Sequence, residues 1–198
     1  PPAQPAEGVH VRPLSVIVRQ PTFLVAAIGA MIGYGVMSFV MTATPLAILG
    51  CGYEFRDAAF VIQWHVLAMY APSFFTGSLI QRFGVRQVML TGAVILTGAV
   101  AVNVSGIDIG HFWFGLVLLG LGWNFMFVGG TSLLAECHTP EERAKAQGLN
   151  DFLVFGALLN AYGWNAVNYG VLPLLGVATA VIAFALWRLR TGAQTPQV

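Results

Sequence analysis

The stretch that decides the fold of this protein is PTFLVAAIGAMIGYGVMSFVMTATPLAIL, residues 21–49. It contains no charged side chain over its whole length. A helix needs roughly 20 consecutive, mostly apolar residues to cross the hydrocarbon core of a bilayer. The stretch therefore predicts a membrane-spanning helix that is long enough to tilt.

The rest of the chain is also strongly apolar. Of its 198 residues, 57% are hydrophobic and 9% are charged, whereas a soluble domain carries about 25% charged residues. Hydropathy predicts six spans, which cover residues 21–49, 58–80, 88–104, 111–136, 148–167 and 171–187. We therefore expect an all-α membrane protein whose partner is the lipid bilayer, with a six-helix transmembrane bundle over residues 21–190. The break between the last two spans is placed at Asn168–Gly170.

The positions of the basic residues predict the orientation of the spans. With six spans, eight of the nine basic residues fall on one side of the membrane, and Arg56 falls on the other. Because cytoplasmic loops are enriched in Lys and Arg, both termini are expected in the cytoplasm. Residues 1–20 then form a cytoplasmic linker and interfacial segment, and residues 191–198 form a cytoplasmic tail. The net charge of +1 gives no indication of a nucleic-acid partner.

A weak internal repeat appears when the chain is shifted by 87 residues. The shift places Gly33-x-Gly35 on Gly120-x-Gly122, and Thr44-x-Leu46 on Thr131-x-Leu133. Since each unit has three helices, the second unit must be inverted in the membrane. Two inverted three-helix repeats are typical of the six-helix half of one transporter class. The repeated glycines are also expected to let neighbouring helices approach closely.

Two pairs of residues at helical spacing form a candidate metal site. Met37 and Met41 are four apart in the first span, and His65 and Met69 are four apart in the second. Residues at i and i+4 share one face of a helix, and a short loop makes the two spans antiparallel neighbours. The four side chains are then expected to meet near mid-membrane, where three thioethers and an imidazole favour Cu(I).

The same residues have other interpretations. Methionine commonly fills irregular space in apolar cores, and Tyr34 and Tyr70, which flank the four residues, equally suit an organic substrate. A histidine within a membrane span is costly and usually functional. Because it titrates near neutral pH, His65 suits proton coupling as well as metal binding.

The segment GSLIQRFGVR, residues 77–86, resembles the loop signature of major facilitator superfamily transporters, which lies between the second and third helices of each half. Gln81 stands where that signature usually has an acid. A complete facilitator has twelve helices, and the Pro-rich start of this chain is similar to its central linker. The resemblance implies the C-terminal half of such a transporter, partnered by an N-terminal six-helix half or by a second copy.

Within that superfamily, the Met37–Met41 and His65–Met69 pairs resemble those of CcoA-like copper importers, which are bacterial inner-membrane proteins that supply copper for assembly of cbb-type cytochrome oxidase. The resemblance implies that copper is the transported ion, that these four residues bind it, and that the protein is not an enzyme. Two other functions stay open. One is a facilitator for a small organic solute with proton coupling through the histidine, and the other is a non-transporting membrane assembly subunit.

The sequence also predicts roles for an aspartate, the two cysteines, a tryptophan and four asparagines. Asp151 is expected to cap the start of the fifth span, with proton coupling as the alternative. Cys51 and Cys137 fall in loops at opposite faces and cannot form a disulfide, and Trp187 is typical of an interfacial anchor. The asparagines within spans are expected to join helices or to line a cavity; they are Asn103, Asn124, Asn160 and Asn165.

Overall fold

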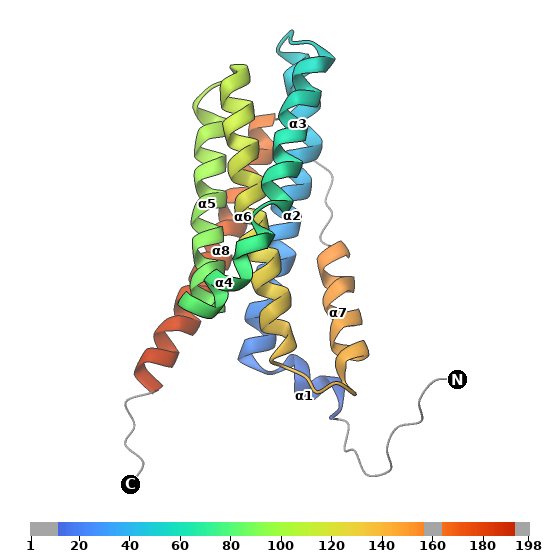
Figure 1. Cartoon of the computed structure of the whole chain (residues 1–198), viewed down its shortest axis with the longest axis vertical. Helices are drawn as coiled ribbons and strands as arrows, with labels where there is room; N and C mark the ends of the chain where they lie inside the picture. Colours follow the sequence, from blue (N-terminus) through green and yellow to red (C-terminus); the bar gives the residue numbers. More distant parts are fainter. Residues whose placement is uncertain (1–11, 157–163, 193–198) are drawn as a thin grey trace, which may run out of the picture.

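The structure is a computed structural model that describes residues 12–156 and 164–192. Its long helices run side by side along one axis (Figure 1). In the two described ranges the helices are α1 (Leu14–Val18), α2 (Pro21–Gly50), α3 (Phe55–Tyr70), α4 (Ser73–Phe83), α5 (Val85–Ser105), α6 (Ile109–Ala135), α7 (Arg143–Gly156) and α8 (Trp164–Gly192). The chain is therefore an all-α protein, as its sequence predicts.

The first four predicted spans are confirmed. By length and composition, α2, α5 and α6 can each cross a membrane, and α3 and α4, bent by 41° relative to each other, pass the same test together as a broken span or a re-entrant loop. The bend falls at Ala71–Pro72, because proline has no amide hydrogen for the helical hydrogen bond. The prediction of one unbroken helix over residues 58–80 is therefore wrong at this point.

The last two predicted spans differ from the structure. The break placed at Asn168–Gly170 is wrong, because these residues lie inside α8. Glycine and polar residues are tolerated within long membrane helices, whose backbone hydrogen bonds are all internal. The described part of the fifth predicted span belongs to α7, which has 14 residues and reaches Gly156, where the residues outside the described ranges begin, so this span stays a prediction. Residues 157–163 and the predicted site of Asn160 lie outside the described residues.

Two smaller expectations are also corrected. Asp151 lies inside α7, which begins at Arg143, so the expected helix cap is wrong. The polar residues that follow Arg143 are helical and lead directly into the apolar residues after Asp151. The helix therefore begins before Asp151 and not at it. At the other end of the chain, α8 continues to Gly192, beyond the bundle boundary expected at residue 190. Residues 1–11 and 193–198, the outer parts of the expected linker and tail, lie outside the described residues.

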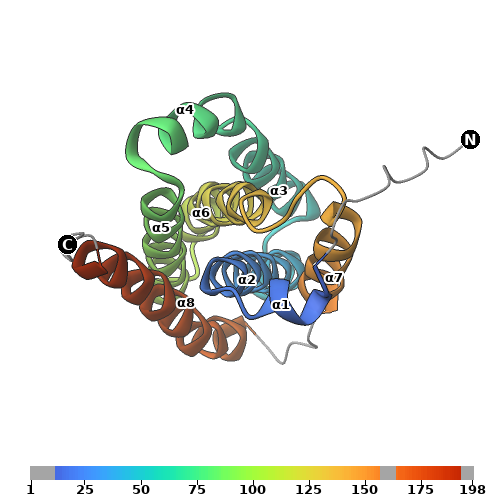
Figure 2. The same ribbon diagram turned by 90° about the horizontal axis from the view of Figure 1, so that it is seen from below.

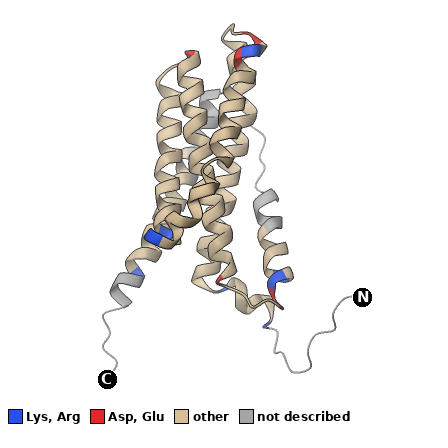
Figure 3. Ribbon diagram, viewed as in Figure 1, with Lys and Arg blue, Asp and Glu red and all other residues tan. Residues whose placement is uncertain are grey.

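The helix directions separate the charged residues into two groups. The α2–α3 and α5–α6 connections lie at the top of Figure 1, and the α4–α5 and α6–α7 connections lie at the bottom. Lys and Arg gather mainly toward the bottom, and the long helices between the ends are almost uncharged (Figure 3). We call the bottom the basic end. The first helices of the two expected repeats, α2 and α6, run in opposite directions, as an inverted repeat requires.

Helix α6 lies inside the bundle, where it packs against α2, α3 and α5 (Figure 2). Glycines allow this close approach. A Cβ atom built on Gly120 would lie 2.6 Å from the carbonyl oxygen of His65 on α3, and one built on Gly122 would lie 3.0 Å from the carbonyl oxygen of Gly92 on α5. The first distance is too short for a side chain and the second is tighter than most contacts of a Cβ atom, so the expected close approach at these two glycines is confirmed.

The segment over residues 77–86 connects α4 and α5 at the basic end. It supplies the last turns of α4, a single turn residue, Gly84, and the start of α5. Gly84 has φ +90°, a backbone conformation that residues with a side chain rarely adopt. The glycine therefore allows the chain to reverse direction between two helices in one residue, where the sequence analysis placed a connecting loop.

Candidate functional site

Helices α2, α3 and α6 bring aromatic and thioether side chains together where they pack against one another, with Met37, Met69 and Trp123 buried and Tyr70 exposed. We call this set the aromatic–methionine cluster; its members are Tyr34, Met37, Met41, Met69, Tyr70, Trp123 and Phe127. Met37 and Met69 are each 6% exposed, and Met41 packs against them. The structure therefore brings together the three methionines that the sequence singled out, from two neighbouring helices.

The aromatic side chains of the cluster contact one another in pairs. The rings of Trp123 and Phe127 are stacked, with centroids 4.9 Å apart and planes 12° apart. Tyr70 meets Trp123 edge to face at 6.3 Å, and Tyr34 lies 6.5 Å from Phe127. The buried Nε1 of Trp123 has no hydrogen-bond partner among the described residues. Such a donor usually has one when buried, so Trp123 presents an unused N–H group to the interior.

Sequence reasoning missed Trp123 and Phe127. Their i, i+4 spacing was a usable signal, because such pairs share a helix face. However, α6 is apolar on nearly all sides, so no face of it stood out in the sequence. Only the packing of α6 against α2 and α3 shows that this pair lies beside the methionines.

His65 is fully buried between α3 and α6. Its Nδ1 lies 2.8 Å from the carbonyl oxygen of Leu116. Because a carbonyl only accepts, Nδ1 carries the proton and Nε2 of the neutral ring keeps a lone pair. Nε2 has no hydrogen-bond partner in the part of the chain that the structure describes. His65 lies one turn before Met69 on α3, and its ring is held by the main chain of α6.

The described side chains include no group of three or more His, Cys, Asp and Glu residues that could hold a metal ion. The proposed copper ligands are mainly methionine thioethers, which are not among these four residue types. The assignment of Met37, Met41, His65 and Met69 to copper therefore stays a prediction.

Asn124 stabilises the break between α3 and α4, next to the cluster. Its Nδ2 donates to the carbonyl oxygen of Met69 at 2.7 Å and to the Ser73 hydroxyl at 2.6 Å. Its Oδ1 lies 2.7 Å from the Thr76 hydroxyl, which also contacts the Pro72 carbonyl. The amide of α6 thus bonds to both sides of the bend, and the expectation that Asn124 joins helices is confirmed.

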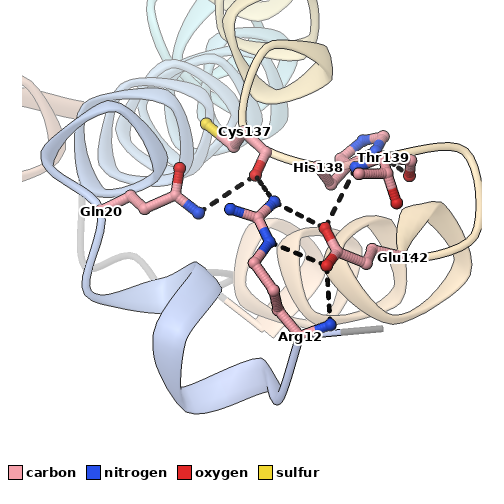
Figure 4. Close-up of polar contacts among 6 residues, drawn as sticks. All are labelled: Arg12, Gln20, Cys137, His138, Thr139 and Glu142. Atoms are coloured by element: carbon pink, nitrogen blue, oxygen red, sulfur yellow. Dashed lines mark hydrogen bonds and ion pairs between the residues drawn. The ribbon is translucent and has the colours of Figure 1, made fainter. Parts of the chain in front are cut away.

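An ion pair between Arg12 and Glu142 lies at the basic end (Figure 4). The guanidinium of Arg12 donates to both carboxylate oxygens of Glu142, at 2.8 and 2.6 Å, and the Arg12 backbone amide donates to the same group at 2.9 Å. Hydrogen bonding to Arg12 holds the pKa of Glu142 at about 2. Arg12 and Gln20 also donate to the carbonyl oxygen of Cys137, each at 3.1 Å. This network attaches the segment before α1 to the α6–α7 connection.

The two cysteines lie at opposite ends of the bundle and are not paired with each other, as expected. Cys51 is exposed, whereas Cys137 is buried and its thiol lies 3.4 Å from the Leu133 carbonyl oxygen. Burial raises the pKa of Cys137 to about 11. Its thiol is therefore protonated at neutral pH and is a weak nucleophile and metal ligand.

Antiparallel apolar helices, charges confined to the ends and buried polar groups between helices define a polytopic membrane protein. Comparison with known proteins identifies its family. The family described as Major Facilitator Superfamily matches residues 1–155, and the chain belongs to it.

Three relatives show how much of such a protein the chain covers. It is 44% identical over 185 residues to the riboflavin transporter RfnT of Brucella anthropi, covering 88% of this chain and 46% of that protein. It is 32% identical to two uncharacterised transporters of the same superfamily type from Bacillus subtilis. The match to YddS covers 82% of this chain and 38% of that protein, and the match to YdeG covers 77% and 37%. The chain therefore spans about half the length, or less, of these curated relatives. No solved structure matches.

These findings confirm the superfamily that the segment over residues 77–86 indicated. They do not support the copper-importer branch, because the relative with 44% identity is named a riboflavin transporter. The Met-x-x-x-Met and His-x-x-x-Met spacings fit a helix that packs its apolar side chains as well as one that binds a soft ion, so copper binding by these residues stays a prediction.

Proposed function

We propose that this chain forms part of a facilitator that moves a small organic solute across a membrane, and that the solute is a planar aromatic compound such as riboflavin. The observation that carries the proposal is the aromatic–methionine cluster, in which Trp123 and Phe127 stack with planes 12° apart. The 44% identity to a riboflavin transporter supports the choice of solute.

The chemistry of the cluster fits a flavin. Offset stacking on aromatic side chains is favourable for a flat ring system, and thioether sulfurs make favourable contacts with aromatic edges. Met37, Met41 and Met69 thus supply adaptable apolar walls around the stacking surface. The unused Nε1–H of Trp123 is a donor for a ring carbonyl oxygen.

Transport would require a second bundle. In facilitators, substrate sites lie near the midplane between repeats, and the two halves rock around them. We propose that an N-terminal six-helix half, or a second copy, completes the site. The basic end then faces the cytoplasm of a bacterial inner membrane, and His65 takes part in proton coupling through its buried ring.

Uptake measurements test this proposal. Cells that cannot synthesise riboflavin and that produce this chain together with an N-terminal six-helix half are expected to accumulate riboflavin, and Trp123→Leu should reduce uptake at least tenfold at equal membrane abundance. Trp123→Phe keeps a stacking surface and should retain part of the uptake. Trp64→Leu is the matched control, since Trp64 is a tryptophan of α3 that pairs with Phe60 and Trp113. Equal uptake by the Trp123→Leu variant and the unmodified protein would reject the site.

Copper remains a second candidate because one observation favours it: three methionines from two helices lie in one cluster. The two functions respond differently to the same variant. A Met37→Leu, Met41→Leu, Met69→Leu triple variant conserves volume and apolarity, so folding should survive. Riboflavin uptake would then fall by a small factor, whereas copper uptake would be lost. Radioactive copper uptake that is unchanged in the triple variant would exclude copper as the substrate.

A further inference from the structure

A groove opens at the basic end between three helices, away from the aromatic–methionine cluster. It has a volume of about 850 Å³, which is within the range of roughly 300–1,000 Å³ for small-molecule sites. Its walls are the first turns of α2, the start of α5 and the last turns of α8. Ten described residues line it; two are arginines, Arg86 and Arg188, and none is acidic.

The groove is polar at one end and apolar at the other. Arg86 is the second residue of α5, and Arg188 lies near the end of α8, so both belong to the basic end. Val181 lies seven residues before Arg188, about 10 Å deeper along the helix axis. Leu24 and Val25 line the same groove one turn inside α2. The guanidinium groups thus lie at the outer end of the groove, and the aliphatic walls lie deeper along the helices.

Aromatic side chains mark the boundary between these two regions. Trp187 is 60% exposed and Phe184 is 56% exposed, and their ring centroids lie 5.9 Å apart. The guanidinium of Arg188 lies over the Phe184 ring at 5.6 Å. Tryptophan next to arginine is typical of the level of the head groups, and basic pockets between membrane helices recognise anionic head groups.

We propose that this groove binds one anionic phospholipid, with its phosphate between Arg86 and Arg188 and its acyl chains along Leu24, Val25 and Val181. The occupant is chosen by charge and by polarity together: a groove lined by two guanidinium groups matches a phosphate, and an apolar floor matches hydrocarbon. This site would hold α8 against α2 and α5 at the basic end. It does not depend on which solute the protein transports.

Quenching of Trp187 fluorescence tests the proposal. The purified protein is placed in phosphatidylcholine nanodiscs that contain increasing fractions of phosphatidylglycerol brominated on its acyl chains, since bromine quenches a tryptophan that it contacts. The difference between the protein and its Trp187→Phe variant reports Trp187 alone. One basic residue near the membrane surface is worth about a fivefold preference for anionic lipid. Half-maximal quenching is therefore expected at an about 25-fold lower fraction of brominated phosphatidylglycerol than of brominated phosphatidylcholine.

Charge variants identify the residues responsible. The Arg86→Gln, Arg188→Gln double variant should lose the preference, and the Arg86→Lys, Arg188→Lys variant should keep most of it, which separates loss of charge from misfolding. Arg82→Gln is the matched control, because Arg82 belongs to the same end and does not line the groove. Equal quenching by both lipids, an equal loss in the Arg82→Gln variant, or removal of the preference by inorganic phosphate alone would each overturn the proposal.

Discussion

Replacement of Asn124 by Leu gives the sharpest test of how the bent span is stabilised. The amide makes three contacts that connect α6 to both sides of the bend, at 2.7 Å to the Met69 carbonyl oxygen, 2.6 Å to the Ser73 hydroxyl and 2.7 Å to the Thr76 hydroxyl. Hydrogen bonds between membrane helices contribute about 0.6 kcal/mol each on average. Loss of all three should therefore lower the free energy of unfolding by about 2 kcal/mol, since Leu has nearly the same volume.

The assay is reversible denaturation in mixed micelles, followed by helical circular dichroism. Thr97→Val is the matched control, because the Thr97 hydroxyl bonds to the Ala93 carbonyl of its own helix. This variant should change the free energy of unfolding by a few tenths of a kcal/mol. The reasoning would be refuted if Asn124→Leu were as stable as the unmodified protein, or if the control lost as much.

Three further outcomes are expected. The pKa of Glu142 is about 2 against an ordinary 4.5, so its pairing with Arg12 contributes fully above pH 4.5 and is lost as the pH falls toward 2; protease protection of the Arg12 segment should follow this course, and Glu142→Gln should remove both the protection and its pH dependence. A thiol reagent should label Cys51 at neutral pH and leave Cys137 unmodified until the protein unfolds, because the latter is buried and its pKa is about 11; rapid labelling of both would contradict the structure. Gly120→Val should destabilise the protein by about 1–3 kcal/mol in thermal unfolding, since its Cβ would lie 2.6 Å from a carbonyl of α3; an unchanged melting temperature would show that α3 and α6 are further apart.

The long apolar helices could be predicted from the sequence because their cause is local. A run such as residues 21–49 has no other way to satisfy its backbone in a bilayer than to form a helix. For the same reason residues 85–105 and 109–135 were predicted within a few residues. The basic residues predicted that successive helices run in opposite directions, because the loops that carry most of the Lys and Arg residues then fall on one side of the membrane. The family followed from the segment over residues 77–86, whose Gly84 has the positive φ that a one-residue turn requires.

Local sequence patterns did not decide the structure where two different structures fit the same pattern. Pro72 was visible in the sequence, but a proline in a membrane helix is compatible with a small kink or with a full break. Asn168–Gly170 reads as a turn and lies inside α8. The spacing of Met37 and Met41 fits packing and metal binding alike, so the sequence alone did not separate copper from an organic solute.

Only the tertiary structure decided which side chains meet. It turned His65 toward the Leu116 carbonyl of α6, and it placed Trp123 and Phe127 beside the methionines. It also joined Arg12 to Glu142 across 130 positions of sequence, and it set Arg86 and Arg188 on one groove. The length of the apolar runs fixes which segments become helices, whereas contacts between helices depend on rotation and depth, which are set by glycine contacts, buried amides and the bend at Pro72.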